Sequence, residues 1–153
     1  MEMPRPLPEQ QALAIRAGDW VGKEHVHPSP FDIAGGPAIG RTRNKLALDG
    51  FAILHDYEQE RNGAVHFRAH GIFHWDSLAH QYVLYWFDSF GMPPSMFRGT
   101  LQSGVLLLTC PQGTGFSRVM FDFSRAGTYQ YRLEVSVDGR EWSTFTDGVY
   151  TKQ

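Results

Sequence analysis

Glycine-containing turns are the feature that most constrains the fold of this chain. Five dipeptides that end in glycine separate segments in which apolar and polar residues alternate. Asn-Gly and Asp-Gly between such segments favour type I′ turns, which join adjacent antiparallel strands and need positive φ at both central residues. Each segment is therefore predicted to pair with its neighbours in the sequence. The five turns are Asp49-Gly50, Asn62-Gly63, Ser103-Gly104, Ala126-Gly127 and Asp138-Gly139.

Strand-like sequence begins at Asp19 and continues almost to the end of the chain. Only two connections are long, Pro28–Pro37 and Gly91–Ser95, and no later segment suits a helix long enough for a parallel crossover. The predicted strands number about ten. They are Asp19–His27, Ala38–Leu48, Phe51–Arg61, Val65–Trp75, His80–Ser89, Met96–Gln102, Val105–Cys110, Phe116–Ser124, Thr128–Val137 and Glu141–Thr151.

A meander of this many strands tends to close on itself, because closure removes its unpaired edges. We therefore expect an all-β fold, an antiparallel up-and-down barrel, with an open sheet or a two-sheet sandwich as the alternatives. Glu9–Ala17 is predicted to be a short helix that plugs or braces the barrel, with Pro8 near its start. Residues 1–8 are expected to form a flexible tail, and residues 9–153 a single domain.

Alternation within the strands predicts which side chains point into the barrel. In the segment Phe51–Arg61, His55 and Tyr57 share a face with apolar residues, while acidic residues occupy the other face. The first set is expected inside, because side chains alternate strictly along a strand. The segment His80–Ser89 is apolar on both faces. We expect its outer face to be covered by a loop, by the helix or by a second subunit in a homodimer.

Composition argues against several classes of function. The formal net charge is −2 and no run of Lys or Arg stands out, so an electrostatic footprint for nucleic acid is missing. No segment approaches the roughly 20 apolar residues of a membrane helix. The opening MEMPRPLPEQQ lacks the basic and apolar regions of a signal peptide. Because Cys110 is the single cysteine, an internal disulfide is impossible and a reducing, cytoplasmic setting is expected.

Several phrases of the sequence resemble a known bacterial family. Gly18-Asp19-Trp20 matches the G-x-W that opens the first strand of lipocalins and related calycin barrels. The phrases LALDGFAILHDYEQERNG, FRAHGIFHWD, YVLYWFDSFGMPPSMFRG and EWSTFTDGVY together are similar to the family called domain of unknown function 1579. The resemblance covers the chain from about residue 13 onward. It implies a lipocalin-like barrel of the fatty-acid-binding or nitrobindin kind, and it brings no established activity.

The chain has seven histidines, so a metal site has to be considered. His66, His70 and His74 are spaced four apart, which on a strand spans about 13 Å, too far for one zinc ion. His25 and His27 would share a strand face about 6.6 Å apart and could chelate. A third ligand would have to come from elsewhere, with Asp32 or Glu24 as candidates, and nothing in the sequence shows that either does. We therefore predict no metal site.

Haem is a more specific alternative, because nitrobindin-like barrels hold haem through one axial histidine. The chemical requirement is an inward histidine in an apolar pocket with aromatic walls. His55 has the inward parity, and His70 would also point inward if Gly71 marked a bulge. The motifs of this chain are not those of nitrobindins, so no cofactor is assigned from the sequence.

A group of polar residues could support acid–base chemistry. His70, Asp88 and Arg98, with nearby tyrosines, could surround a small acidic or phenolic ligand, with Arg98 gripping a carboxylate. Alternatively, Asp88 and Arg98 pair with each other across adjacent strands and fasten the intervening loop. The sequence contains no G-x-S-x-G motif, and its Gly-rich stretch GGPAIG precedes a strand rather than a helix. We therefore expect a binding protein rather than an enzyme.

The leading hypothesis is a barrel that binds one small apolar or aromatic molecule. Small barrels enclose cavities with apolar walls and a few polar anchors, and this chain supplies both. The alternative is that the aromatic side chains fill the barrel completely. Trp20, Trp142 and Tyr150 are interpreted as packing residues. The candidate ligand-binding residues are His55, Tyr57, His70, Trp86, Asp88 and Arg98.

Overall fold

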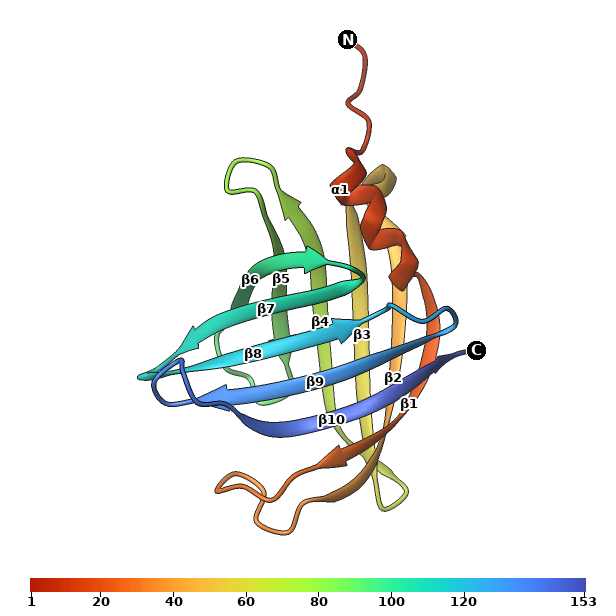
Figure 1. The fold of residues 1–153 in the computed structure, drawn as a ribbon. Coiled ribbons are helices and arrows are strands. Elements are labelled where there is room, and N and C mark those ends of the chain that lie inside the picture. Colours follow the sequence, from red (N-terminus) through yellow and green to blue (C-terminus); the bar gives the residue numbers. More distant parts are fainter.

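The computed structural model describes residues 1–153 as ten antiparallel strands in a closed barrel, preceded by a short helix (Figure 1). The strand limits agree with the predicted segments to within two residues at each end. The strands are β1 (Gly18–Val26), β2 (Gly36–Ala47), β3 (Ala52–Arg61), β4 (Ala64–Asp76), β5 (Gln81–Asp88), β6 (Ser95–Gln102), β7 (Val105–Gln112), β8 (Gly115–Asp122), β9 (Thr128–Ser136) and β10 (Ser143–Lys152).

Every strand pairs with its neighbours in the sequence, and β1 also pairs with β10, which closes the barrel. The closing pair runs from Trp20 opposite Lys152 to Val26 opposite Thr146. The expected up-and-down barrel is therefore confirmed, and neither the open sheet nor the sandwich is formed. No helix in the structure has the length and apolar character that a membrane crossing requires.

Three of the predicted turns have positive φ at both central residues, as a type I′ turn requires. Asp49 and Gly50 adopt φ of 55° and 95°, Asn62 and Gly63 adopt 52° and 79°, and Ser103 and Gly104 adopt 51° and 81°. Glycine, asparagine and aspartate reach positive φ at low cost, whereas Ser103 adopts it without that advantage. At Asp138-Gly139 only the glycine has positive φ, and Asp138 instead accepts hydrogen bonds from the backbone of the longer β9–β10 loop.

The N-terminal helix closes one end of the barrel. It begins one residue before the predicted start, as α1 (Pro8–Gln11), and continues as a 3-10 helix, η1 (Ala12–Arg16). Leu13 is buried against the barrel, whereas Ile15 on the other side is exposed. The Trp20 indole donates to the Arg16 carbonyl at 3.0 Å, and the Tyr82 hydroxyl donates to the Glu9 carbonyl at 2.9 Å. We call this end of the barrel, which the helix covers and which is at the top of Figure 1, the floor.

Aromatic rings fill the barrel just above the floor. Trp20 contacts Phe123 and Tyr129 edge to face, and Tyr129 stacks on Tyr150 with ring centroids 4.6 Å apart. The packing roles predicted for Trp20 and Tyr150 are therefore confirmed. The prediction for Trp142 was wrong. It precedes β10 and lies half-buried with the Arg118 guanidinium 4.1 Å above its ring.

The predicted alternation holds in β3, where Ile53, His55, Tyr57 and Gln59 are all buried. The expectation for β5 is met only in part. Val83 on its outer face is buried, but Tyr85 and Phe87 are 39% and 49% exposed. Neither the helix nor a loop of this chain covers them. The outer face of β5 is thus an exposed apolar surface.

Candidate ligand-binding site

The barrel encloses a cavity of about 1040 Å³ above the floor, so its side chains do not fill it completely. All ten strands contribute to the wall, which is apolar over more than half of its residues. Loop residues between β1 and β2 and between β5 and β6 also line it, at the end opposite the floor. We call that end the mouth. It carries the exposed apolar side chains Phe31, Phe90 and Met92.

The structure places four of the six predicted site residues in the cavity wall. His55 and Tyr57 come from β3, and Trp86 and Asp88 from β5. All four have the inward parity of their strands. His70 and Arg98 lie outside the barrel.

His55 is 3% exposed and is held by a chain of hydrogen bonds to the floor. Its Nδ1 lies 2.5 Å from the Asn44 side-chain oxygen, and the Asn44 amide nitrogen donates to the Arg16 carbonyl at 2.9 Å. The rings of Phe73, Trp86 and Phe121 surround the imidazole, with centroids 5.4, 6.0 and 6.3 Å away. Burial lowers the pKa of His55 to about 4. The imidazole is therefore neutral at neutral pH.

Tyr57, which is part of the cavity wall, also belongs to a network of buried hydrogen bonds around Glu24. The Tyr57 hydroxyl donates to Glu24 Oε1 at 2.7 Å, and the Gln59 amide donates to the same oxygen at 3.3 Å. Burial raises the pKa of the Glu24 carboxyl. The hydrogen bonds to the carboxylate lower that pKa, but they offset the effect of burial only in part. Burial likewise raises the pKa of Tyr57, and the nearby Glu24 charge adds to it. Tyr57 is therefore a protonated donor committed to Glu24.

A glycine makes room for this network. Gly40 on β2 faces the same space, where a Cβ would overlap the Tyr150 hydroxyl and approach Glu24 Oε1 to 2.5 Å. Any side chain at this position would displace the buried carboxyl or the tyrosine.

Trp86 and Asp88 connect the cavity wall to the mouth. The Trp86 indole donates to Asp88 Oδ2 at 3.1 Å, and the backbone N–H of Phe90 donates to Asp88 Oδ1 at 3.0 Å. The carboxylate thus fixes both the indole and the start of the β5–β6 loop. These two hydrogen bonds hold the Asp88 carboxylate at the rim of the barrel, where it has no cationic partner.

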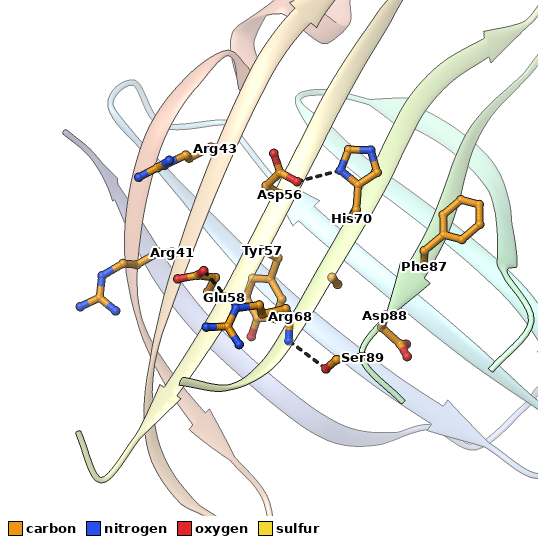
Figure 2. Close-up of a pocket in the computed structure, with 11 residues that line it drawn as sticks. Arg41, Arg43, Asp56, Tyr57, Glu58, Arg68, His70, Phe87, Asp88 and Ser89 are labelled. Carbon is orange, nitrogen blue, oxygen red and sulfur yellow. Dashed lines mark hydrogen bonds and ion pairs between the residues drawn. The ribbon is translucent and has the colours of Figure 1, made fainter. Parts of the chain in front are cut away.

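His70 lies on the outer surface, where its Nδ1 is 2.7 Å from Asp56 Oδ1 (Figure 2). The bulge that would turn it inward is absent at Gly71, because β4 pairs with β3 and β5 without interruption there. The register shift between β3 and β4 lies instead at Gln59/Glu60. His70 therefore lies among the charged side chains that line the outer-surface groove shown in Figure 2.

Arg98 also points outward, and it pairs with Asp76 at 3.1 Å rather than with Asp88. Its strand partner is Val83, which is on the outer face of β5, whereas Asp88 has the inward parity of Trp86. The expected Asp88–Arg98 pair is thus not formed. The cluster of histidine, tyrosine, aspartate and arginine proposed for acid–base chemistry is divided between the two faces of the sheet.

Sequence reasoning missed the buried role of three polar residues that organise the interior: Arg16, Glu24 and Asn44. Alternation could have found Glu24, because it shares the inward parity of Trp20 in β1. The burial of Arg16 depends on how the helix docks, which no local pattern indicates. Its guanidinium lies 4.7 Å from the Phe123 ring centroid and has no hydrogen-bond partner.

His25 in β1 and His27, which directly follows that strand, lie next to each other on the outside of the barrel. The rings of His25 and His27 are 4.6 Å apart, and His27 Nε2 is 3.3 Å from Asp147. No group of three or more His, Cys, Asp or Glu side chains is arranged to hold a metal ion.

These features define a class of protein, a ten-stranded up-and-down β-barrel of lipocalin-like architecture with an internal cavity. Residues 5–152 match a family described as "Protein of unknown function (DUF1579)". The chain belongs to this family, which confirms the resemblance seen in its sequence.

The fold is similar to a solved structure described as the crystal structure of Rv2717c from M. tuberculosis. The two share a TM-score of 0.73 and 13% sequence identity, over 96% of this chain and 98% of that one. At this identity the similarity concerns the fold alone. None of the curated proteins compared with the sequence matches it.

Proposed function

We propose that this protein binds a small apolar or aromatic molecule inside its barrel. The observation that carries the proposal is the cavity of about 1040 Å³, with a largely apolar wall and few free polar groups. Ligand sites of proteins have this size and this character. Access is from the mouth, since the helix closes the opposite end.

Binding is favoured over catalysis by the positions of the polar residues. His70 and Arg98 lie outside the barrel, and Tyr57 and Asp88 inside it are already engaged by Glu24 and Trp86. Of the predicted site residues in the cavity only His55 keeps a free acid–base group, and a reaction that pairs an acid with a base would need a second such group beside the ligand. The single cysteine, Cys110, fits a protein of a reducing compartment, and we propose a cytoplasmic location.

Haem is the second candidate, because the fold resembles that of nitrobindins and one observation favours it. His55 supplies a neutral imidazole in the cavity wall whose Nε2 has no partner within the protein. Axial ligation needs one such nitrogen, so the donor fits. When bound, haem would supply redox and gas-binding chemistry, while the protein's part is to present His55 and exclude water.

The first experiment is an absorption spectrum of the purified protein followed by native mass spectrometry. A Soret band would identify haem, and another reproducible extra mass would identify a different cargo. We expect an organic mass without a Soret band, or, for protein at its bare mass, thermal shifts with apolar aromatic probes. Bare mass together with no shift for any probe would contradict the proposal.

A pair of variants tests whether the ligand occupies the cavity. Val135→Trp places a large ring in the cavity wall, whereas Val149→Trp makes the same change on the exposed face of β10. We expect Val135→Trp to abolish the probe shift and Val149→Trp to keep it. Equal shifts in both variants would place binding outside the barrel.

We also propose that the outer face of β5 pairs two copies of the chain. Tyr85 and Phe87 are exposed there, and Met96 lies opposite Tyr85 on β6 with 41% exposure. Contiguous apolar side chains of this kind are typical of protein interfaces.

A further inference from the structure

The hydrogen bonds around His55 fix the position of its proton. The Asn44 amide nitrogen donates to the Arg16 carbonyl, so the Asn44 oxygen is directed at His55. A carbonyl oxygen only accepts, so the Nδ1 that faces it must carry the proton. In a neutral imidazole the other nitrogen then has a free lone pair. His55 therefore presents Nε2 as a hydrogen-bond acceptor.

This acceptor has no partner within the protein. Nδ1 makes the only hydrogen bond of the His55 side chain, and Nε2 is not among the polar atoms that are sealed from solvent without a partner. Because the residue is 3% exposed and lines the cavity, the remaining access of Nε2 is from the cavity. An acceptor in such a position gains stability from any donor that a ligand brings.

The surroundings of Nε2 favour a flat apolar group. Phe73 and Phe121 meet the imidazole edge to face, and Trp86 is tilted by 35° to it. Two polar groups of the cavity wall are already satisfied, since Tyr57 is bound to Glu24 and the Thr42 hydroxyl is 3.1 Å from that of Tyr129. A ligand that reaches this depth thus meets the free acceptor of His55 among aromatic rings.

Burial keeps that acceptor unprotonated, and the buried Arg16 assists without touching the ligand. Its guanidinium nitrogens are sealed beneath the cavity, and the positive charge adds to the burial that disfavours a second charge on His55. The acidic residue nearest in the sequence, Asp56, has the opposite effect but lies on the outer surface with His70. His70 itself opposes protonation of His55.

We propose that the cavity selects a planar apolar ligand with a neutral hydroxyl at its leading end, of the phenol class, which donates to His55 Nε2. This inference rests on the proposed binding function. A carboxylate would place its negative oxygens against the Nε2 lone pair. An ether of the same shape would leave the acceptor unpaired.

Three probes that share one ring system test the proposal. They are 2-naphthol, which donates, 2-methoxynaphthalene, which cannot donate, and 2-naphthoate, which is an anion. A naphthol is protonated at neutral pH, as the phenol of tyrosine is. We expect the wild-type protein to bind 2-naphthol about tenfold more tightly than either of the others, the usual effect of one hydrogen bond to a buried acceptor.

Variants and a spectroscopic measurement identify the acceptor. His55→Phe should reduce the affinity for 2-naphthol to that of 2-methoxynaphthalene, while Trp86→Leu should weaken both ligands alike. In protein labelled with ¹⁵N-histidine, 2-naphthol should shift the Nε2 resonance of His55, and 2-methoxynaphthalene should not. The last measurement needs no variant, so it holds even if His55→Phe does not fold.

The outcomes separate the two proposals. Equal affinities for 2-naphthol and its methyl ether, or tighter binding of 2-naphthoate, would overturn the hydroxyl selectivity and leave the binding function intact. Failure of all three probes and of the wider panel would overturn both.

Discussion

The single residue Glu24 determines both a buried hydrogen-bond network and part of the pH dependence of stability. It is a carboxyl group on the inward face of β1, where Tyr57 and Gln59 are its donors. Its pKa is raised in the folded chain, so the folded state holds the Glu24 proton more strongly than the unfolded state does. The stability contributed by this difference is present at low pH and is lost as pH rises through the raised pKa.

Replacing Glu24 should reveal this dependence. Glu24→Gln keeps an acceptor for Tyr57 and removes the charge, so the variant should lose the decline in stability with rising pH. Glu24→Ala removes the acceptor of the Tyr57 hydroxyl, while Gln59 keeps its hydrogen bond to that hydroxyl, and the change should cost roughly 1–3 kcal/mol. Chemical denaturation at several pH values measures both. A Glu24→Gln protein with the wild-type pH profile would contradict this account.

His55 should act in the opposite direction. Its pKa is 6.5 when unfolded and about 4 when folded, so the unfolded state binds the additional proton between these values. The free energy of unfolding should fall by roughly 3 kcal/mol as pH drops from 6.5 to 4, at 1.36 kcal/mol per unit, and level off below. His55→Gln should lack this decline, and the exposed control His80→Asn should keep it.

At the scale of elements, alternation within a strand was the reliable guide. It placed His55 and Tyr57 inside because β3 has one acidic face and one apolar face. The same rule, applied to β6, puts Arg98 with Met96 on the outside. Arg98 was predicted to pair with Asp88 across adjacent strands, but the register of β5 against β6 places Arg98 opposite Val83. The partners of Arg98 and His70 depend on such registers, which no single segment encodes.

The floor depends on one face of the N-terminal helix. Leu13 is 1% exposed within the aromatic cluster, whereas Ile15 is 53% exposed. Leu13→Ala should therefore destabilise the protein by roughly 2–5 kcal/mol. Ile15→Ala, a comparable truncation on the solvent side, should change stability by less than about 0.5 kcal/mol. Urea denaturation compares the two, and similar costs would mean that the helix does not pack as described.

At the scale of the whole molecule, the closed barrel leaves the outer face of β5 as an apolar surface without a cover. If two copies pair there, sedimentation velocity at micromolar concentration should report a dimer. Phe87→Lys should dissociate it, because burying the new charge is costly. Val149→Lys on β10 should not. A strictly monomeric wild-type protein would show that this face stays in water.

The pairing of β1 with β10 also brings the end of the chain beside the start of β1. Lys152 lies opposite Trp20 beside the floor, and the Gln153 N–H donates to the Asp19 carbonyl at 2.9 Å (Figure 1). A tether at either end would therefore hold the barrel with its mouth facing the solution. A circular permutant that links Gln153 to the N-terminal tail and starts within the β9–β10 loop would keep every strand intact.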